Sequence, residues 1–137
     1  QRHCENGEAV ARHLAKHPAI SKVHWPGFED HPGHDVAARQ MHGFGGMVAF
    51  TLADDNLDTA KAVVASTKLF TLAESLGGVE SLIGHPATMT HASIPKEVRE
   101  KTGVTDGLIR LSVGVEDAAD LIADLDQALA AATAGRG

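Results

Sequence analysis

The chain has 137 residues, of which 43% are hydrophobic and 22% are charged, and its formal net charge is −6 at pH 7. This length fits one domain, and the apolar content is sufficient for a hydrophobic core, which excludes an intrinsically disordered chain. The acidic balance argues against electrostatic nucleic-acid binding, and no apolar run approaches the ~20 residues that a membrane span needs. The single cysteine, Cys4, cannot form an internal disulfide and favours a reducing, cytoplasmic setting.

Helical and strand patterns alternate along the chain, punctuated by proline and glycine. The helix at 32–41 is expected to place Val36, Ala37 and Met41 on one side, and 117–132 is the clearest helix, with Asp117 as its cap. The predicted elements are, in order, helix 2–16, strand 20–25, helix 32–41, strand 47–52, helix 56–65, strand 69–72, strand 79–83, helix 95–101, strand 108–113 and helix 117–132. The fold class predicted is α/β (an α+β layered domain) of about five strands with helices covering one face.

Two sequence features suggest chemistry but have ordinary structural explanations. The glycine-rich segment 43–46 follows a helix and precedes a strand, whereas a phosphate-binding loop needs the reverse order, so a structural turn is expected. His31 and His34, with His42 nearby, supply too few converging ligands for a zinc site, and no metal is expected.

Arg110 is the most informative single residue. In strand 108–113 it shares one face with Leu108 and Ser112, while Ile109 and Leu111 lie on the other. A guanidinium among apolar residues needs a carboxylate or phosphate partner, and its planar fork suits the α-carboxylate of an amino acid. An internal ion pair, with Glu80 for example, is an equally good interpretation of this pattern.

The segment 72–81 (LAESLGGVES) is the second unusual feature. It places two carboxylates, two hydroxyls and two glycines between apolar residues. Glycine lets a backbone approach another group closely, so the composition indicates an irregular segment, of the kind found at binding sites.

Together these segments resemble the C-terminal domain of the Cys/Met-metabolism family of pyridoxal-phosphate enzymes. The resemblance covers most of the chain and rests on long ordered strings rather than a short motif. The strings are RQM at 39–41, GFGGMV at 43–48, FTLAESLGGVESLI at 70–83, HPATMTHAS at 85–93 and IRLSVGVED at 109–117. It implies the small domain of a fold-type I enzyme, with a largely antiparallel sheet.

The resemblance also implies a chemistry and four substrate-binding residues. These enzymes hold pyridoxal phosphate on a lysine and use its ring as an electron sink, so that groups on the γ carbon of an amino acid leave or are replaced. Arg110 matches the arginine that binds the substrate α-carboxylate, and Ser75 matches a serine beside the cofactor lysine. Glu74 matches a glutamate at the far end of a long substrate such as cystathionine, and Thr90 lines the same region. A glutamate at this position is typical of cystathionine γ-lyases and γ-synthases, whereas methionine γ-lyases tend to have an apolar residue there.

The resemblance further implies that residues 1–137 are the substrate-binding domain of a longer enzyme. The cofactor lysine and the other cofactor-binding groups of the family match no position here, so no catalytic or cofactor-binding residue is expected in this chain, which alone should be inactive. The expected partners are the enzyme's own larger N-terminal domain and substrates such as cystathionine, O-acylhomoserine or cysteine, in a cytoplasmic homotetramer. The alternatives are a methionine γ-lyase, an O-acylhomoserine sulfhydrylase, or a non-catalytic binding or assembly module.

Overall fold

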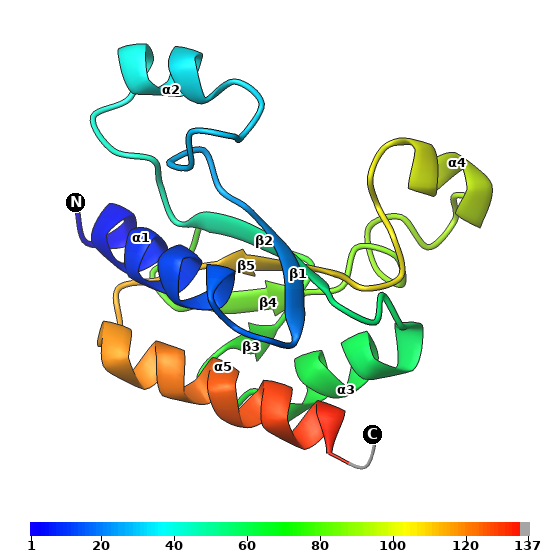
Figure 1. The fold of residues 1–137 in the computed structure, drawn as a ribbon. Coiled ribbons are helices and arrows are strands. Elements are labelled where there is room, and N and C mark those ends of the chain that lie inside the picture. The colour runs from blue at the N-terminus through cyan, green and yellow to red at the C-terminus, as the bar shows by residue number, and fades with distance from the viewer. Residues whose placement is uncertain (135–137) are drawn as a thin grey trace.

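A computed structural model describes residues 1–134 of the chain. Helices and strands alternate along this range and form one five-stranded sheet (Figure 1). The elements are α1 (Arg2–Ala15), β1 (Ile20–His24), α2 (His34–Gln40), β2 (Met47–Leu52), α3 (Leu57–Ser66), β3 (Thr71–Leu72), β4 (Leu82–Gly84), α4 (Lys96–Lys101), β5 (Leu108–Ser112) and α5 (Ala118–Thr133).

The sheet has the strand order β1-β2-β5-β4-β3. The three pairings β1–β2, β2–β5 and β4–β5 are antiparallel, and only β3–β4 is parallel. Helices α1, α3 and α5 pack together on one face, whereas α2 and α4 project away from the sheet (Figure 1). The predicted fold class is therefore confirmed: a mostly antiparallel five-stranded sheet with helices on one face.

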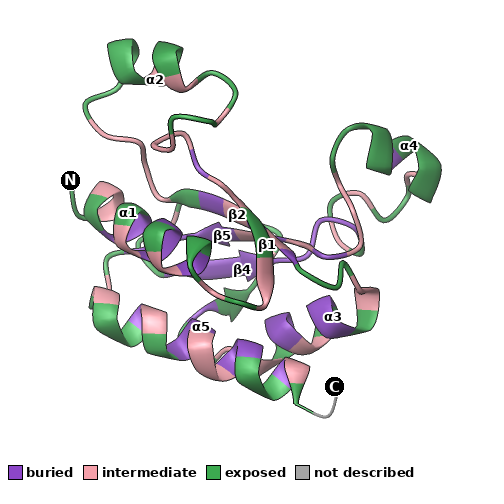
Figure 2. Ribbon diagram, viewed as in Figure 1, coloured by how far each residue is buried: buried purple, intermediate pink, exposed green. Residues whose placement is uncertain are grey.

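Strand alternation separates a helix-covered face from an open one. Phe50, Ile109 and Leu111 are fully buried and contribute to the core beneath the helices. The residues between them point to the other face, where Ala49 pairs with Arg110. Figure 2 shows the buried residues concentrated between the sheet and the helices.

Helix α5 follows its predicted pattern closely. Leu121, Leu125 and Leu129 are fully buried, four residues apart on one face. The Asp117 side chain accepts hydrogen bonds from the backbone N–H groups of Ala119 and Asp120, which would otherwise lack partners at the start of the helix.

The predicted strands 69–72 and 79–83 are much shorter in the structure, as β3 and β4. The Asp124 carboxylate of α5 accepts hydrogen bonds from the backbone N–H groups of Lys68, Leu69 and Phe70. These groups cannot also join a strand ladder, so β3 begins only at Thr71. In the predicted strand 79–83, the N–H of Ser81 donates to the Glu116 carboxylate instead of a neighbouring strand, and β4 begins only at Leu82.

Helix α2 also differs from its prediction. It covers only His34–Gln40 and contains no buried residue. Val36 and Met41, expected on one packed side, are 46% and 45% exposed. The helix lies in the excursion between β1 and β2, which extends away from the sheet (Figure 1). Its apolar spacing therefore does not correspond to burial against any part of residues 1–134.

Candidate functional site

Arg110 lies on the open face of β5 between very small neighbours. Ala49 of β2 pairs with it on one side and Gly84 of β4 on the other. A methyl group added to Gly84 would come 3.8 Å from Nη2 of Arg110 and 3.2 Å from the carbonyl oxygen of Ala73. The two small residues therefore leave space for a bulky guanidinium on this face.

The guanidinium of Arg110 makes no ion pair with any residue of the range 1–134. Its Nη2 donates to the backbone carbonyl oxygen of Glu74 at 3.1 Å, which uses one of the N–H groups of the fork. No carboxylate oxygen in this range lies within 4.0 Å of it, so the internal ion pair with Glu80 is not formed. The arginine is half-buried and retains N–H groups for an external anion.

The guanidinium borders a shallow hollow on the open face. The residues around it are Ala73, Glu74, Gly84, His85, Pro86, Met89, Thr90 and Arg110. Three of the four predicted site residues, Arg110, Glu74 and Thr90, are thus brought together from segments far apart in the sequence. The hollow is too shallow to hold a water-sized molecule. The residues around it can therefore form one side of a binding site but do not enclose a ligand.

Ser75 is the predicted site residue that does not border this hollow. It follows Glu74 in the loop 73–81, and the side chains of both residues are exposed. Neither side chain is hydrogen-bonded or ion-paired to any residue in the range 1–134. Both are accessible to a ligand placed over the open face.

The loop 73–81 ends in a network of buried polar groups. The backbone N–H and the hydroxyl of Ser81 both donate to the Glu116 carboxylate at 2.8 Å, and the Ser81 hydroxyl accepts from Gly114 N–H. Burial would raise the pKa of Glu116, but these donors outweigh it and hold the pKa below its usual value. The end of the loop is therefore fixed by a charged group that stays ionised.

The opposite wall of the hollow is the turn that follows β4. His85 is 1% exposed; Nε2 lies 2.6 Å from the carbonyl oxygen of Asp106 and Nδ1 lies 2.8 Å from the Thr88 hydroxyl. Because a carbonyl can only accept, Nε2 carries the proton and Nδ1 accepts from Thr88. Burial lowers the pKa of His85 despite the opposing effect of Asp106, so the neutral ring holds this turn. Thr90, at the rim, bonds His91 through its hydroxyl.

Asp106 links that turn to α4. Its carboxylate pairs with Arg99 at 2.5 Å and with Lys96 at 2.9 Å. These contacts lower the pKa of Asp106, with the hydrogen bonds from Lys96 and Arg99 as the main causes. The cluster is internally satisfied and serves to anchor the turn.

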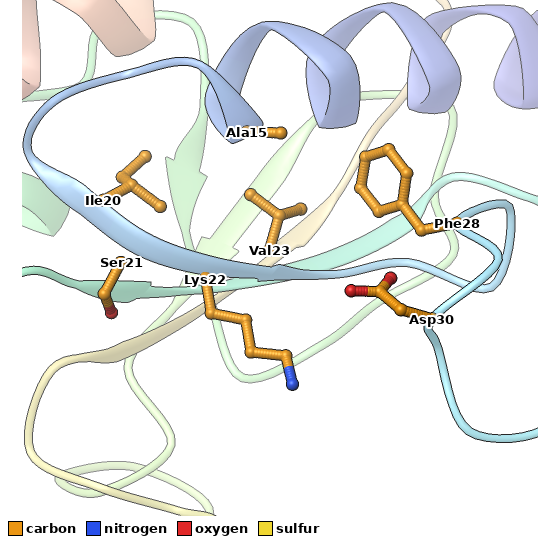
Figure 3. Close-up of a pocket in the computed structure, with 7 residues that line it drawn as sticks. All are labelled: Ala15, Ile20, Ser21, Lys22, Val23, Phe28 and Asp30. Carbon is orange, nitrogen blue, oxygen red and sulfur yellow. The ribbon is translucent and has the colours of Figure 1, made fainter.

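A second hollow, of about 260 Å³, lies at the edge strand β1 beneath the end of α1. Figure 3 shows Val23 and Phe28 pointing toward the helix while Lys22 points away from it. None of the four predicted site residues borders it. In the range 1–134 no group of three or more His, Cys, Asp or Glu side chains converges to hold a metal, and no helix there could span a bilayer.

Comparison with known proteins identifies the family of the chain. Residues 1–130 match the model of the Cys/Met metabolism PLP-dependent enzymes. The chain belongs to this family. Its cofactor is pyridoxal phosphate, and the predicted family resemblance is confirmed.

Curated relatives of this chain have three different names. It is 56% identical over 129 residues to a cystathionine beta-lyase of Coxiella burnetii and 57% identical over 129 residues to a cystathionine gamma-synthase of Mycobacterium tuberculosis. It is 50% identical over 129 residues to an L-methionine gamma-lyase of Fusobacterium nucleatum. Each match covers 94% of this chain but only 32–33% of the relative, so the chain spans about a third of the length of these proteins.

Three residues at this site or beside it were not predicted from the sequence. His85 and Met89 form the wall opposite Glu74, and Ser112 accepts a hydrogen bond from the N–H of Gly77 at 2.7 Å. The strand alternation that places Arg110 on the open face also places Ser112 there, and this spacing was the available signal. No comparable periodicity marks His85 or Met89, which lie in an irregular turn.

Proposed function

We propose that this chain is the substrate-binding part of a pyridoxal-phosphate-dependent transsulfuration enzyme that catalyses γ-elimination or γ-replacement on cystathionine or O-acylhomoserine. The observation that carries the proposal is the half-buried guanidinium of Arg110, which no carboxylate of the range 1–134 neutralises. Family membership supplies the chemical context.

In this proposal Arg110 binds the α-carboxylate of the substrate. A guanidinium fork donates two parallel hydrogen bonds to a carboxylate and so fixes its orientation as well as its position. The contact from Arg110 to the Glu74 carbonyl holds the fork against the loop and limits its movement. Correct orientation of the carboxylate also fixes the direction of the Cα–H bond that reacts.

Glu74 is proposed to bind the distal ammonium of cystathionine. Its carboxylate is exposed and without a partner in the described chain, next to the hollow that Arg110 borders. Thr90 lines the same hollow from the opposite turn, and Ser75 lies at the exposed surface of the loop, where it would face the cofactor side. The two charged groups would thus bind the two ends of one long amino acid.

Pyridoxal phosphate, when bound, supplies a ring that accepts electrons from carbons next to the substrate amino group. The residues around Arg110 fit a substrate carboxylate rather than the cofactor, because none of the six lysines borders the hollow. We therefore propose that a larger domain of the enzyme holds the cofactor and that the chain alone is inactive. A cytoplasmic homotetramer remains the expected state of the intact enzyme.

The decisive experiment compares substrates with the intact enzyme. Cystathionine is supplied alone, and O-acylhomoserine is supplied separately with cysteine. Turnover of the first at its γ carbon identifies a lyase, and turnover of the second identifies a synthase. Glu74→Gln should raise KM for cystathionine while leaving the KM for methionine unchanged in any methionine-cleaving activity. Turnover of neither substrate pair would overturn the proposal.

The relatives also support a second candidate, a methionine γ-lyase. One relative carries that name at 50% identity. Glu74 argues against it, because the methyl end of methionine offers nothing for a carboxylate to bind. Release of methanethiol from methionine at a kcat/KM above that for cystathionine would favour this alternative.

A further inference from the structure

Two neighbouring side chains on the open face of β5 hold the middle of the loop 73–81. Nη2 of Arg110 donates to the carbonyl oxygen of Glu74 at 3.1 Å, and the N–H of Gly77 donates to the hydroxyl of Ser112 at 2.7 Å. Within residues 74–78 these are the two hydrogen bonds to the rest of the described chain. The loop crosses from β3 over β4 to reach them, because β5 lies two strands away from β3.

The two anchors differ in what else they do. Arg110 faces the proposed substrate, so a bound carboxylate competes for its N–H groups. Ser112 is 4% exposed, and its contact with Gly77 depends on no ligand. Gly77, three residues after Glu74, has a φ angle of +83°, in the left-handed region that favours glycine. This conformation fixes the direction of the loop at Gly77. The Ser112 hydroxyl therefore holds the turn that determines where Glu74 projects.

We propose that Ser112 is a positioning residue for substrate specificity: it fixes the loop so that Glu74 meets the distal ammonium of a long amino-acid substrate. This inference rests on the function proposed above. The proposal assigns the two ends of the substrate to different residues. Arg110 binds the carboxylate, and Ser112 acts through Glu74 on the opposite end. Loss of the Ser112 hydroxyl should weaken recognition of the distal end more than that of the carboxylate, because Arg110 itself stays in β5.

The test is Ser112→Ala in the intact holoenzyme. Gly77 is exposed, so water can accept its freed N–H and the variant should keep its fold. KM for cystathionine should rise about fivefold, the ratio equivalent to one typical hydrogen bond. The Ki of norleucine, which has the same carboxylate but an apolar end, should rise by a clearly smaller factor. Hydrogen exchange followed by mass spectrometry should show faster exchange in the peptide that covers residues 74–78, at the Gly77 N–H that Ser112 binds.

Two further variants serve as controls. Ser112→Thr keeps the hydroxyl and should restore the cystathionine KM, because a surface hollow of about 180 Å³ beside Ser112 leaves room for a methyl group. Thr51→Val removes a hydroxyl from the same sheet face, one strand away, and should change neither KM nor exchange in the loop.

Each alternative result has a distinct meaning. Equal weakening of cystathionine and norleucine, or unchanged exchange in residues 74–78, would overturn the role of Ser112. If the unmodified enzyme binds norleucine but not cystathionine, the proposed function is wrong. In that case faster loop exchange in Ser112→Ala still supports Ser112 as the loop anchor, and unchanged exchange rejects it.

Discussion

Arg110 is half-buried, yet no carboxylate of residues 1–134 pairs with its guanidinium, so N–H groups remain for an external anion. The arginine Arg99 in the same domain shows the contrast, since it is 8% exposed and paired with Asp106. Arg110 donates only to a backbone carbonyl, which carries no net charge. A guanidinium left in this state is stabilised by an incoming carboxylate.

Replacing Arg110 with lysine in the intact enzyme should reduce kcat/KM with little effect on Tm. Lysine keeps the charge but loses the two parallel hydrogen bonds of the fork. Losing one charge-assisted hydrogen bond costs roughly 1.5–3 kcal/mol, or about tenfold to over a hundredfold in kcat/KM. Both quantities are measured on one preparation. A variant with a lower Tm but normal kinetics would falsify the substrate role and show a structural one.

Asp124→Asn should destabilise the chain by about 1–3 kcal/mol, because an amide cannot accept from all three backbone N–H groups that the carboxylate binds. Urea unfolding at pH 7 measures this loss. Unchanged stability would show that the N–H groups of residues 68–70 find other acceptors.

The same carboxylate should make stability depend on acidic pH. Burial opposes ionisation of Asp124, but the backbone donors of Lys68, Phe70 and Leu69 and the Gln127 side chain lower its pKa below 3.8. A lowered folded pKa gives stabilisation that is complete above the ordinary value and is lost as pH falls through the folded value. The stability difference between the unmodified chain and Asp124→Asn should therefore shrink below pH 3.8, as thermal melts across that range would show.

At the scale of elements, the loop 73–81 and the segment after β5 fit together closely. A methyl group on Gly114 would overlap the Val79 carbonyl oxygen and the Glu116 carboxylate. The N–H of Val115 also donates to the Val79 carbonyl oxygen at 3.0 Å, so the two segments cannot separate without losing hydrogen bonds. The absence of a side chain at Gly114 thus permits the loop to reach its position over the open face.

Gly114→Ala should cost roughly 1–3 kcal/mol and increase exchange in residues 74–81. Gly78→Ala is the matched control in the same loop. Its added methyl group meets the Glu80 side chain at 3.2 Å, and this side chain can move aside. Chemical denaturation and hydrogen exchange measure both variants. Equal effects of the two substitutions would contradict the proposed close fit at Gly114.

At the scale of the whole molecule, apolar side chains remain uncovered around the proposed site. Leu72, Leu76 and Val79, on β3 and the loop, are 51%, 53% and 67% exposed. Helix α2 is also without buried residues and extends away from the sheet (Figure 2). Exposed apolar side chains on segments next to the proposed binding site are typical of an interface.

The isolated chain should therefore self-associate. The physical reason is the free energy gained when exposed apolar area leaves water. Sedimentation velocity over a range of concentrations measures this association, and Leu76→Lys should reduce it. A monomer that persists at high concentration would contradict the expectation that this surface is covered in the intact enzyme.

Local patterns in the sequence were sufficient for several elements and for the position of Arg110. Helix α5 has a regular leucine stripe with Asp117 as its cap, and β2 and β5 alternate cleanly because one face of each is buried. The open-face position of Arg110 follows from that alternation. The family and three of the residues that surround the hollow followed from long ordered strings, which no local rule of secondary structure supplies.

Only the tertiary structure decided which groups compete for the backbone of the remaining segments. Asp124 lies 54–56 residues away in sequence from the N–H groups that it binds in residues 68–70, and it delays the start of β3 until Thr71. Glu116 lies 35 residues away from Ser81, whose N–H it binds. Such contacts leave no periodic pattern in the sequence, because a carboxylate can bind the N–H groups of any segment that the fold places beside it. The sequence likewise determined that Arg110 lies among apolar neighbours that cannot pair with its charge. Only the fold decided that no carboxylate of residues 1–134 would neutralise it, because that depends on which distant segments lie beside β5.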